Sequence, residues 1–113
     1  MTIHVLSEKA TPAQVSEMLA EYGVMIKIAV DVRKKVLAGG GVMHADCEKL
    51  LLDSGSDQDS IWGANWHPAE QRIEFEAIIN IRPRQDNRSM RLQSEERRQA
   101  VEAVTRQILG GVQ

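Results

Sequence analysis

The stretch that decides the fold is RIEFEAIINIRPRQDNRS, residues 72–89. Its first half alternates with a period of two, which is typical of a β-strand because successive side chains point to opposite faces of a sheet. One face carries Ile73, Phe75, Ala77, Ile79 and Ile81, and the other carries Arg72, Glu74, Glu76, Ile78, Asn80 and Arg82. Pro83 ends the pattern because proline has no N–H to donate. The stretch predicts an antiparallel strand over residues 72–82, with one buried face and an arginine-rich turn after it.

Working outward from this strand, the chain predicts two hairpins and three helices. The predicted strands are residues 26–32, 36–38, 61–67 and 72–82, and the predicted helices run from Pro12, over residues 42–53, and from Ser94. Residues 3–6 are compatible with an additional edge strand. The order (β)α-ββ-α-ββ-α predicts an α+β fold, with a four-stranded, mainly antiparallel sheet and the three helices over its apolar face.

The composition is that of an ordinary globular chain. With 113 residues, 42% hydrophobic and 27% charged, it is predicted to form a single domain over residues 1–113. We expect no membrane span and no signal peptide, because no long apolar run is present and the first residues lack a basic start. Cys47 is the only cysteine, which favours the cytoplasm. The net charge of −2 gives no general affinity for nucleic acid.

Three segments carry a family resemblance: LAGGGVMHADCE (37–48), IWGANW (61–66) and INIRPRQDNRSM (79–90). Together they resemble a family of small bacterial proteins, a domain of unknown function common in cyanobacteria. The resemblance implies a bacterial, cytoplasmic, single-domain α+β protein. It implies no activity, substrate or catalytic residue, so the function has to be inferred from the residues themselves.

The arginine-rich turn is the first candidate site, because guanidinium and amide groups donate hydrogen bonds to carboxylates and phosphates. The candidate binding residues are Asn65, Asn80, Arg82, Arg84, Asn87, Arg88 and Ser89. We expect a non-enzymatic binding or interaction domain that recognises an anionic group or a protein partner through the polar sheet face and this turn. Ile78 lies on that polar face, which suggests a covering partner such as a second copy in a homodimer. The structural alternative is that Asp31, Glu74 and Glu76 bind the arginines in internal ion pairs.

A small hydrolase or metal-dependent enzyme is the alternative function. His44, Asp46 and Glu48 lie on the predicted helix 42–53, and Asp31 and His67 could add metal ligands. Because a His/Glu pair at this spacing is common on helix surfaces, we expect no metal, no cofactor and no catalytic residue.

Three further residues have structural interpretations. Cys47 is in register with the apolar face of helix 42–53, so it is expected to be a buried small hydrophobe. Trp62 and Trp66 share one strand face and are expected in the core. That leaves few aromatic side chains for stacking on bases, which together with the net charge disfavours nucleic-acid binding. Gly63, on the opposite face of that strand, would admit a close approach of backbone or ligand.

Overall fold

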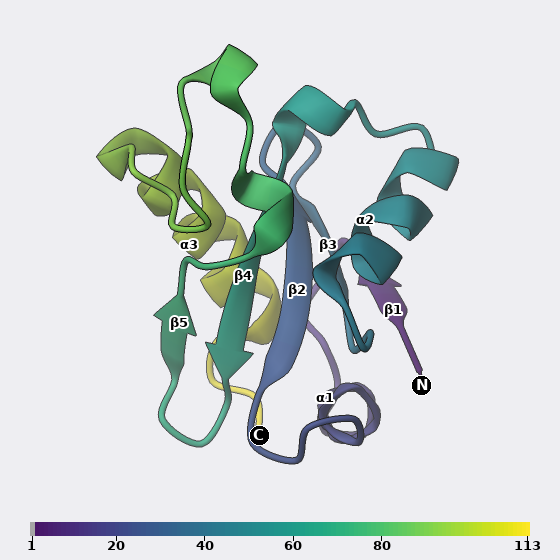
Figure 1. Cartoon of the computed structure of the whole chain (residues 1–113). Coiled ribbons are helices and arrows are strands. Elements are labelled where there is room, and N and C mark those ends of the chain that lie inside the picture. Colours follow the sequence, from purple (N-terminus) through teal and green to yellow (C-terminus); the bar gives the residue numbers. More distant parts are fainter. Residues whose placement is uncertain (1) are drawn as a thin grey trace.

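The computed structural model describes residues 2–113 and contains one antiparallel sheet, in the order β1-β3-β2-β4-β5 (Figure 1). The strands are β1 (His4–Leu6), β2 (Ile26–Asp31), β3 (Val36–Gly39), β4 (Ile61–His67) and β5 (Arg72–Glu74). The helices are α1 (Pro12–Leu19), α2 (His44–Asp53) and α3 (Glu95–Leu109). The α+β class and the order of elements are confirmed. The sheet has five strands rather than four, because residues 4–6 pair with β3 at its edge.

Local sequence signals explain where the helices begin. Thr11 caps α1, with its hydroxyl accepting from Gln14 N at 3.1 Å while the Gln14 side chain accepts from Thr11 N at 2.9 Å. Ser94 caps α3 by accepting from Arg97 N at 3.2 Å. The longest helix, α3, has 15 residues, which is fewer than the roughly 20 that a membrane-spanning helix needs. Within residues 2–113, no helix combines the length and apolar character needed to cross a bilayer.

Helices cover both faces of the sheet, α2 in front and α3 behind in the view of Figure 1. The larger core lies on the α1 and α3 side, where Ile28 and Val30 of β2 pack in one cluster with Trp62 and Trp66 of β4. The smaller core lies under α2 and contains Ala29, Ala38, Cys47, Leu51 and Ile61. The prediction that all helices cover one apolar face is therefore wrong. Small side chains on the second face of β2 and β3 leave room for α2 to pack there.

The predicted strand over residues 72–82 is wrong beyond Glu74. After an isolated bridge between Glu76 and Arg91, the chain forms a 3₁₀ turn at Ile78–Asn80 and a second at Pro83–Gln85. This segment crosses β4 at Gly63, where an added Cβ would lie 2.5 Å from the Ala77 Cβ. The expectation that Gly63 allows a close approach of backbone or ligand is confirmed, and what approaches it is Ala77 of the same chain.

The side chain of Asn80 replaces the backbone hydrogen bonds that β5 does not make to β4. Its side-chain Oδ1 accepts from Gly63 N at 2.8 Å, and its Nδ2 donates to Gly63 O at 3.0 Å and to Met90 O at 3.1 Å. A buried side-chain amide thus satisfies the edge of β4 that β5 leaves open. This contact fixes residues 77–80 against the sheet and places them opposite α2.

Candidate functional site

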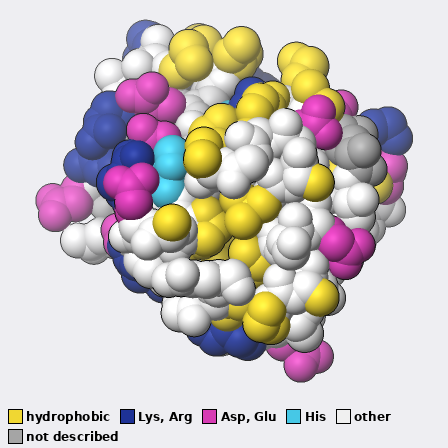
Figure 2. All heavy atoms as spheres, turned by 90° about the horizontal axis from the view of Figure 1, so that it is seen from below, with side chains coloured by type: hydrophobic (Ala, Val, Ile, Leu, Met, Phe, Trp, Pro, Cys, Tyr) yellow, Lys and Arg dark blue, Asp and Glu magenta, His cyan; other side chains and the backbone are white. Residues whose placement is uncertain are grey.

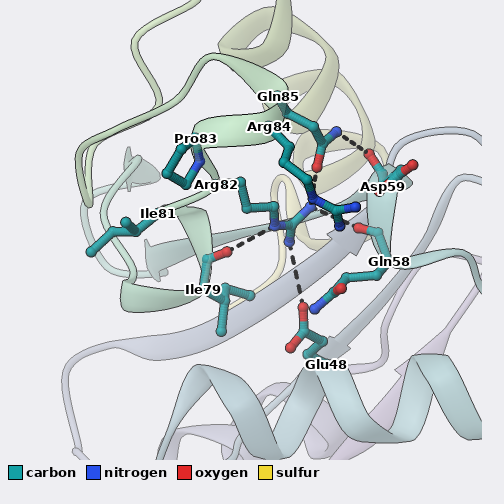
Figure 3. A pocket seen from close by; sticks show the side chains of 9 residues that line it. All are labelled: Glu48, Gln58, Asp59, Ile79, Ile81, Arg82, Pro83, Arg84 and Gln85. Atoms are coloured by element: carbon teal, nitrogen blue, oxygen red, sulfur yellow. Dashed lines mark hydrogen bonds and ion pairs between the residues drawn. The ribbon is translucent and has the colours of Figure 1, made fainter.

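Arg82 lies at the centre of the predicted site, and all five of its N–H groups are used inside the protein (Figure 3). The acceptors are the backbone oxygens of Gln58, Ile61 and Ile79, the side-chain oxygen of Gln85, and the Glu48 carboxylate at 3.4 Å. The guanidinium carbon lies 4.3 Å from the centre of the Trp62 ring. Burial lowers the pKa of Arg82, an effect that the neighbouring Glu48 and Asp59 oppose. Arg82 therefore holds the turn to β4 and α2.

Asn87 organises the rest of the turn in the same way. It is fully buried, and its Nδ2 donates to the backbone oxygens of Asn80, Ser89 and Arg91 at 2.8, 2.9 and 3.1 Å. Its Oδ1 accepts from Gln93 N at 2.9 Å. The Ser89 hydroxyl accepts from Arg91 N at 3.2 Å. Asn87 and Ser89 therefore bind their own loop, whereas the Asn80 side chain also bonds Gly63 of β4.

Arg84 and Arg88 remain at the surface. Arg88 forms an exposed ion pair with Asp86 at 2.8 Å. The Arg84 side chain is exposed and makes no hydrogen bond or ion pair with residues 2–113. It lines a cleft of about 340 Å³ with Glu48, Gln58, Asp59, Ile79, Ile81, Arg82, Pro83 and Gln85 (Figure 3). The two acidic and two basic side chains of this cleft cancel, so the cleft as a whole has no net charge.

A second cleft, of about 350 Å³, lies at the N-terminal end of α2 and is mostly apolar. It is lined by Met25, Lys27, Met43, His44, Ala45, Asn65, Glu76, Ala77, Ile78, Ile79 and Met90. Ile79 lines both clefts. His44 lines the apolar cleft, and Glu48, one helical turn further along α2, lines the cleft that contains Arg84. The two clefts together, called the α2 groove below, follow α2 opposite residues 76–85.

Several large hydrophobic side chains around the apolar cleft are exposed: Met43 by 54%, Ile78 by 67% and Met90 by 45%. The exposure of Ile78 agrees with the prediction. On the face seen from below in Figure 2, hydrophobic side chains gather around a central hollow, and charged ones lie toward the margins. Of the two clefts of the α2 groove, the apolar cleft is therefore the one where burial by a ligand would remove more hydrophobic area from water.

His44 is the one imidazole in this cleft, and its tautomer follows from its partners. Its Nε2 lies 3.0 Å from Ala64 O and 2.8 Å from Asn65 Oδ1, which are both acceptors, so Nε2 carries the proton. Burial lowers the pKa of His44, and the nearby Lys27 adds to the shift. The neutral ring leaves a lone pair on Nδ1, which makes no hydrogen bond with residues 2–113. Asn65, another candidate binding residue, is used to hold His44.

The structure does not bring the residues of the hydrolase or metal alternative together. Asp46 Oδ2 accepts from Met43 N at 3.0 Å, and Glu48 faces Arg82. His67 bonds Glu74 at 2.7 Å, and the buried Asp31 accepts from two backbone amides and from the Ser56 hydroxyl. Among residues 2–113, no three His, Cys, Asp or Glu side chains are grouped as a metal ion requires.

Cys47 is fully buried on the side of α2 that packs against the sheet, which confirms the prediction that it packs as a small hydrophobe. Burial raises the pKa of its thiol to about 11. A thiol that stays protonated at neutral pH is a poor nucleophile. The polar sheet face that the sequence predicts is covered in part by α2 and by residues 76–80, and what stays open on it is the apolar cleft between them.

Comparison with known proteins identifies a family. Residues 4–108 match the family described as protein of unknown function (DUF5674), and the chain belongs to it. No curated protein and no solved structure matches the chain.

Proposed function

We propose that this DUF5674 protein is a non-catalytic interaction domain whose α2 groove binds a segment of a protein partner. The observation that carries the proposal is the apolar cleft with three exposed hydrophobic side chains at its margin, Met43, Ile78 and Met90. Its volume of about 350 Å³ is at the lower end of ligand sites, which span roughly 300–1,000 Å³. A cleft of this size accommodates one or two side chains of a partner segment.

The free energy of binding would come mainly from apolar contact. Full burial of an Ile or Met side chain contributes roughly 1.5–3 kcal/mol, so covering these three partly exposed side chains supports a weak to moderate affinity. Methionine adapts its shape to the group that it contacts. These properties favour a short hydrophobic anchor over an extended rigid interface.

Arg84 supplies the second part of the proposed recognition. Its unpaired guanidinium lies at the other end of the α2 groove, where it can take an acidic side chain of the same segment. Because the charged side chains of each cleft cancel, the groove favours a segment with one or two carboxylates over a highly charged polyanion. This balance supports a protein partner rather than nucleic acid. We place the interaction in the bacterial cytoplasm, which the single unpaired cysteine supports.

A display library of random short peptides tests the proposal, with the wild-type chain as bait and three variants for comparison. Ile78→Asp places a charge at the apolar cleft, and Arg84→Glu reverses the free charge. Val5→Asp is the matched control, because Val5 is 45% exposed on β1 and lines neither cleft of the α2 groove. We expect enriched peptides with a hydrophobic anchor near Asp or Glu, and an affinity at least about tenfold lower for Ile78→Asp than for the control.

Two outcomes would change the conclusion. If no peptide is enriched, or if enriched peptides bind all four proteins equally, the α2 groove is not the binding surface. If the wild-type chain alone dimerises with concentration and Ile78→Asp abolishes this, the occupant is a second copy of the chain. Sedimentation equilibrium of the two proteins measures the second case.

A further inference from the structure

His44 lines the apolar cleft, and its partners determine which of its ring nitrogens donates a hydrogen bond and which accepts one. Ala64 O and Asn65 Oδ1 both face His44 Nε2, and an imidazole with the proton on Nε2 has a lone pair on Nδ1. Turning the Asn65 amide over would not change this, because Ala64 O can only accept. His44 is therefore held as an acceptor toward any group that reaches its Nδ1.

The surroundings of His44 favour an aromatic group. Three methionines, Met25, Met43 and Met90, line the cleft with Ile78 and Ile79. Thioether sulfur makes favourable contacts with aromatic rings, often at the ring edge. Lys27 also lines the cleft, and its ammonium lies 5.0 Å from the centre of the Tyr22 ring, so it already contacts one aromatic face.

We infer that the apolar cleft takes an aromatic group with its own hydrogen-bond donor, an indole N–H or a phenol O–H, which donates to His44 Nδ1. The inference rests on the proposed function and specifies the anchor of the partner segment as a tryptophan or tyrosine side chain. The ring contacts the methionines and isoleucines, and the donor fixes its orientation. Interfaces often use such side chains, because they combine a large apolar area with one polar atom.

The acceptor also provides selectivity. A purely hydrocarbon ring in the cleft would exclude water from Nδ1 without replacing its hydrogen bond, which is unfavourable for a buried polar atom. An indole or phenol replaces that bond. The cleft should therefore discriminate between two rings of nearly equal shape that differ only in the donor.

Indole and 1-methylindole form the matched pair of probes, because methylation removes the N–H and keeps the ring. Each is titrated into the full chain carrying ¹³C-methyl methionine and ¹⁵N-imidazole histidine labels, and NMR reports on the cleft. We expect both probes to shift the Met43 and Met90 methyl signals, with indole binding at least about fivefold more tightly. That ratio corresponds to about 1 kcal/mol, the value of one hydrogen bond. Indole alone should shift the His44 Nδ1 signal.

The variant His44→Leu removes the acceptor and puts a hydrocarbon side chain in place of the imidazole. It should bind the two probes equally, which would support the inference. Equal affinities in the wild-type chain, with the methionine signals still shifting, would overturn the role of His44 and leave the binding groove standing. No shift of Met43 or Met90 with either probe would overturn both the inference and the proposed groove.

Discussion

Replacing Asn80 with leucine tests how the wall of the α2 groove is held. Asn80 is fully buried, and its side chain makes hydrogen bonds with Gly63 N, Gly63 O and Met90 O. Leucine has the same branching and the same number of side-chain heavy atoms, and it makes none of these hydrogen bonds. Met90 O keeps a second donor, Ala77 N at 3.0 Å, so the loss falls mainly on the two Gly63 groups.

The expected loss of stability follows from these two groups. A buried donor or acceptor left without a partner costs about 1–3 kcal/mol, so Asn80→Leu should lower the free energy of unfolding by about 2–6 kcal/mol. This is a large part of the roughly 5–15 kcal/mol that stabilises a typical domain. Urea unfolding followed by the fluorescence of the buried Trp62 and Trp66 measures it.

Gln107→Leu is the matched control, since Gln107 is exposed on α3 and its side chain makes no hydrogen bond with residues 2–113. We expect its free energy of unfolding to stay within about 0.5 kcal/mol of the wild type. A loss below about 1 kcal/mol for Asn80→Leu would refute the reasoning. It would mean that residues 77–80 are not held to β4 by this amide.

Three other predictions concern Arg82, His44 and Cys47. Arg82→Leu leaves the Glu48 carboxylate without its buried partner, so it should destabilise the protein by about 3–5 kcal/mol in urea unfolding, whereas Arg84→Ala should change stability by less than about 0.5 kcal/mol. Burial lowers the pKa of His44 below its ordinary 6.5, so the unfolded chain takes up a proton that the folded chain does not as the pH falls below that value. The free energy of unfolding should therefore decrease from about pH 7 to about pH 5 more steeply in the wild type than in His44→Leu. Cys47, with a pKa raised to about 11, should react with a thiol reagent in urea and remain unreactive in the folded protein, and rapid labelling of the native chain would contradict this.

Local sequence was sufficient where local contacts decide the structure. The starts of α1 and α3 follow from Thr11 and Ser94, whose side chains cap residues three positions away. The hairpin between β4 and β5 follows from the alternation on either side of Pro68. These features depend on residues close together in the chain, so period and capping rules can find them.

The error beyond Glu74 has a cause that local patterns do not contain. The alternation through Ala77 and Ile79 fits a β-strand as well as it fits a segment that crosses β4 at Gly63. What ends the ladder is the Asn80 amide, which bonds a residue 17 positions earlier. A period-two pattern indicates which side chains are buried. It does not show whether the segment bonds the neighbouring strand through its backbone or through a side chain such as that of Asn80.

The candidate site changed for a similar reason. Three of the five acceptors that bind Arg82 come from residues 48, 58 and 61, far away in sequence, so the local sequence around Arg82 does not show that its donors are occupied. The apolar cleft was missed, although Ile78 was recognised as exposed on a polar face. Met43 and Met90 both line it although they are 47 positions apart in the chain, and only the fold brings them together.

The most direct test of the α2 groove is a set of intermolecular nuclear Overhauser effects between a selected peptide and the methionine methyl groups of the chain. We predict contacts from the peptide's hydrophobic anchor to the methyl groups of Met43 and Met90, and none to Met18, which belongs to α1 and is buried against β3 on the other side of the sheet. Contacts confined to residues outside the α2 groove, such as Val5 on β1, would contradict the account.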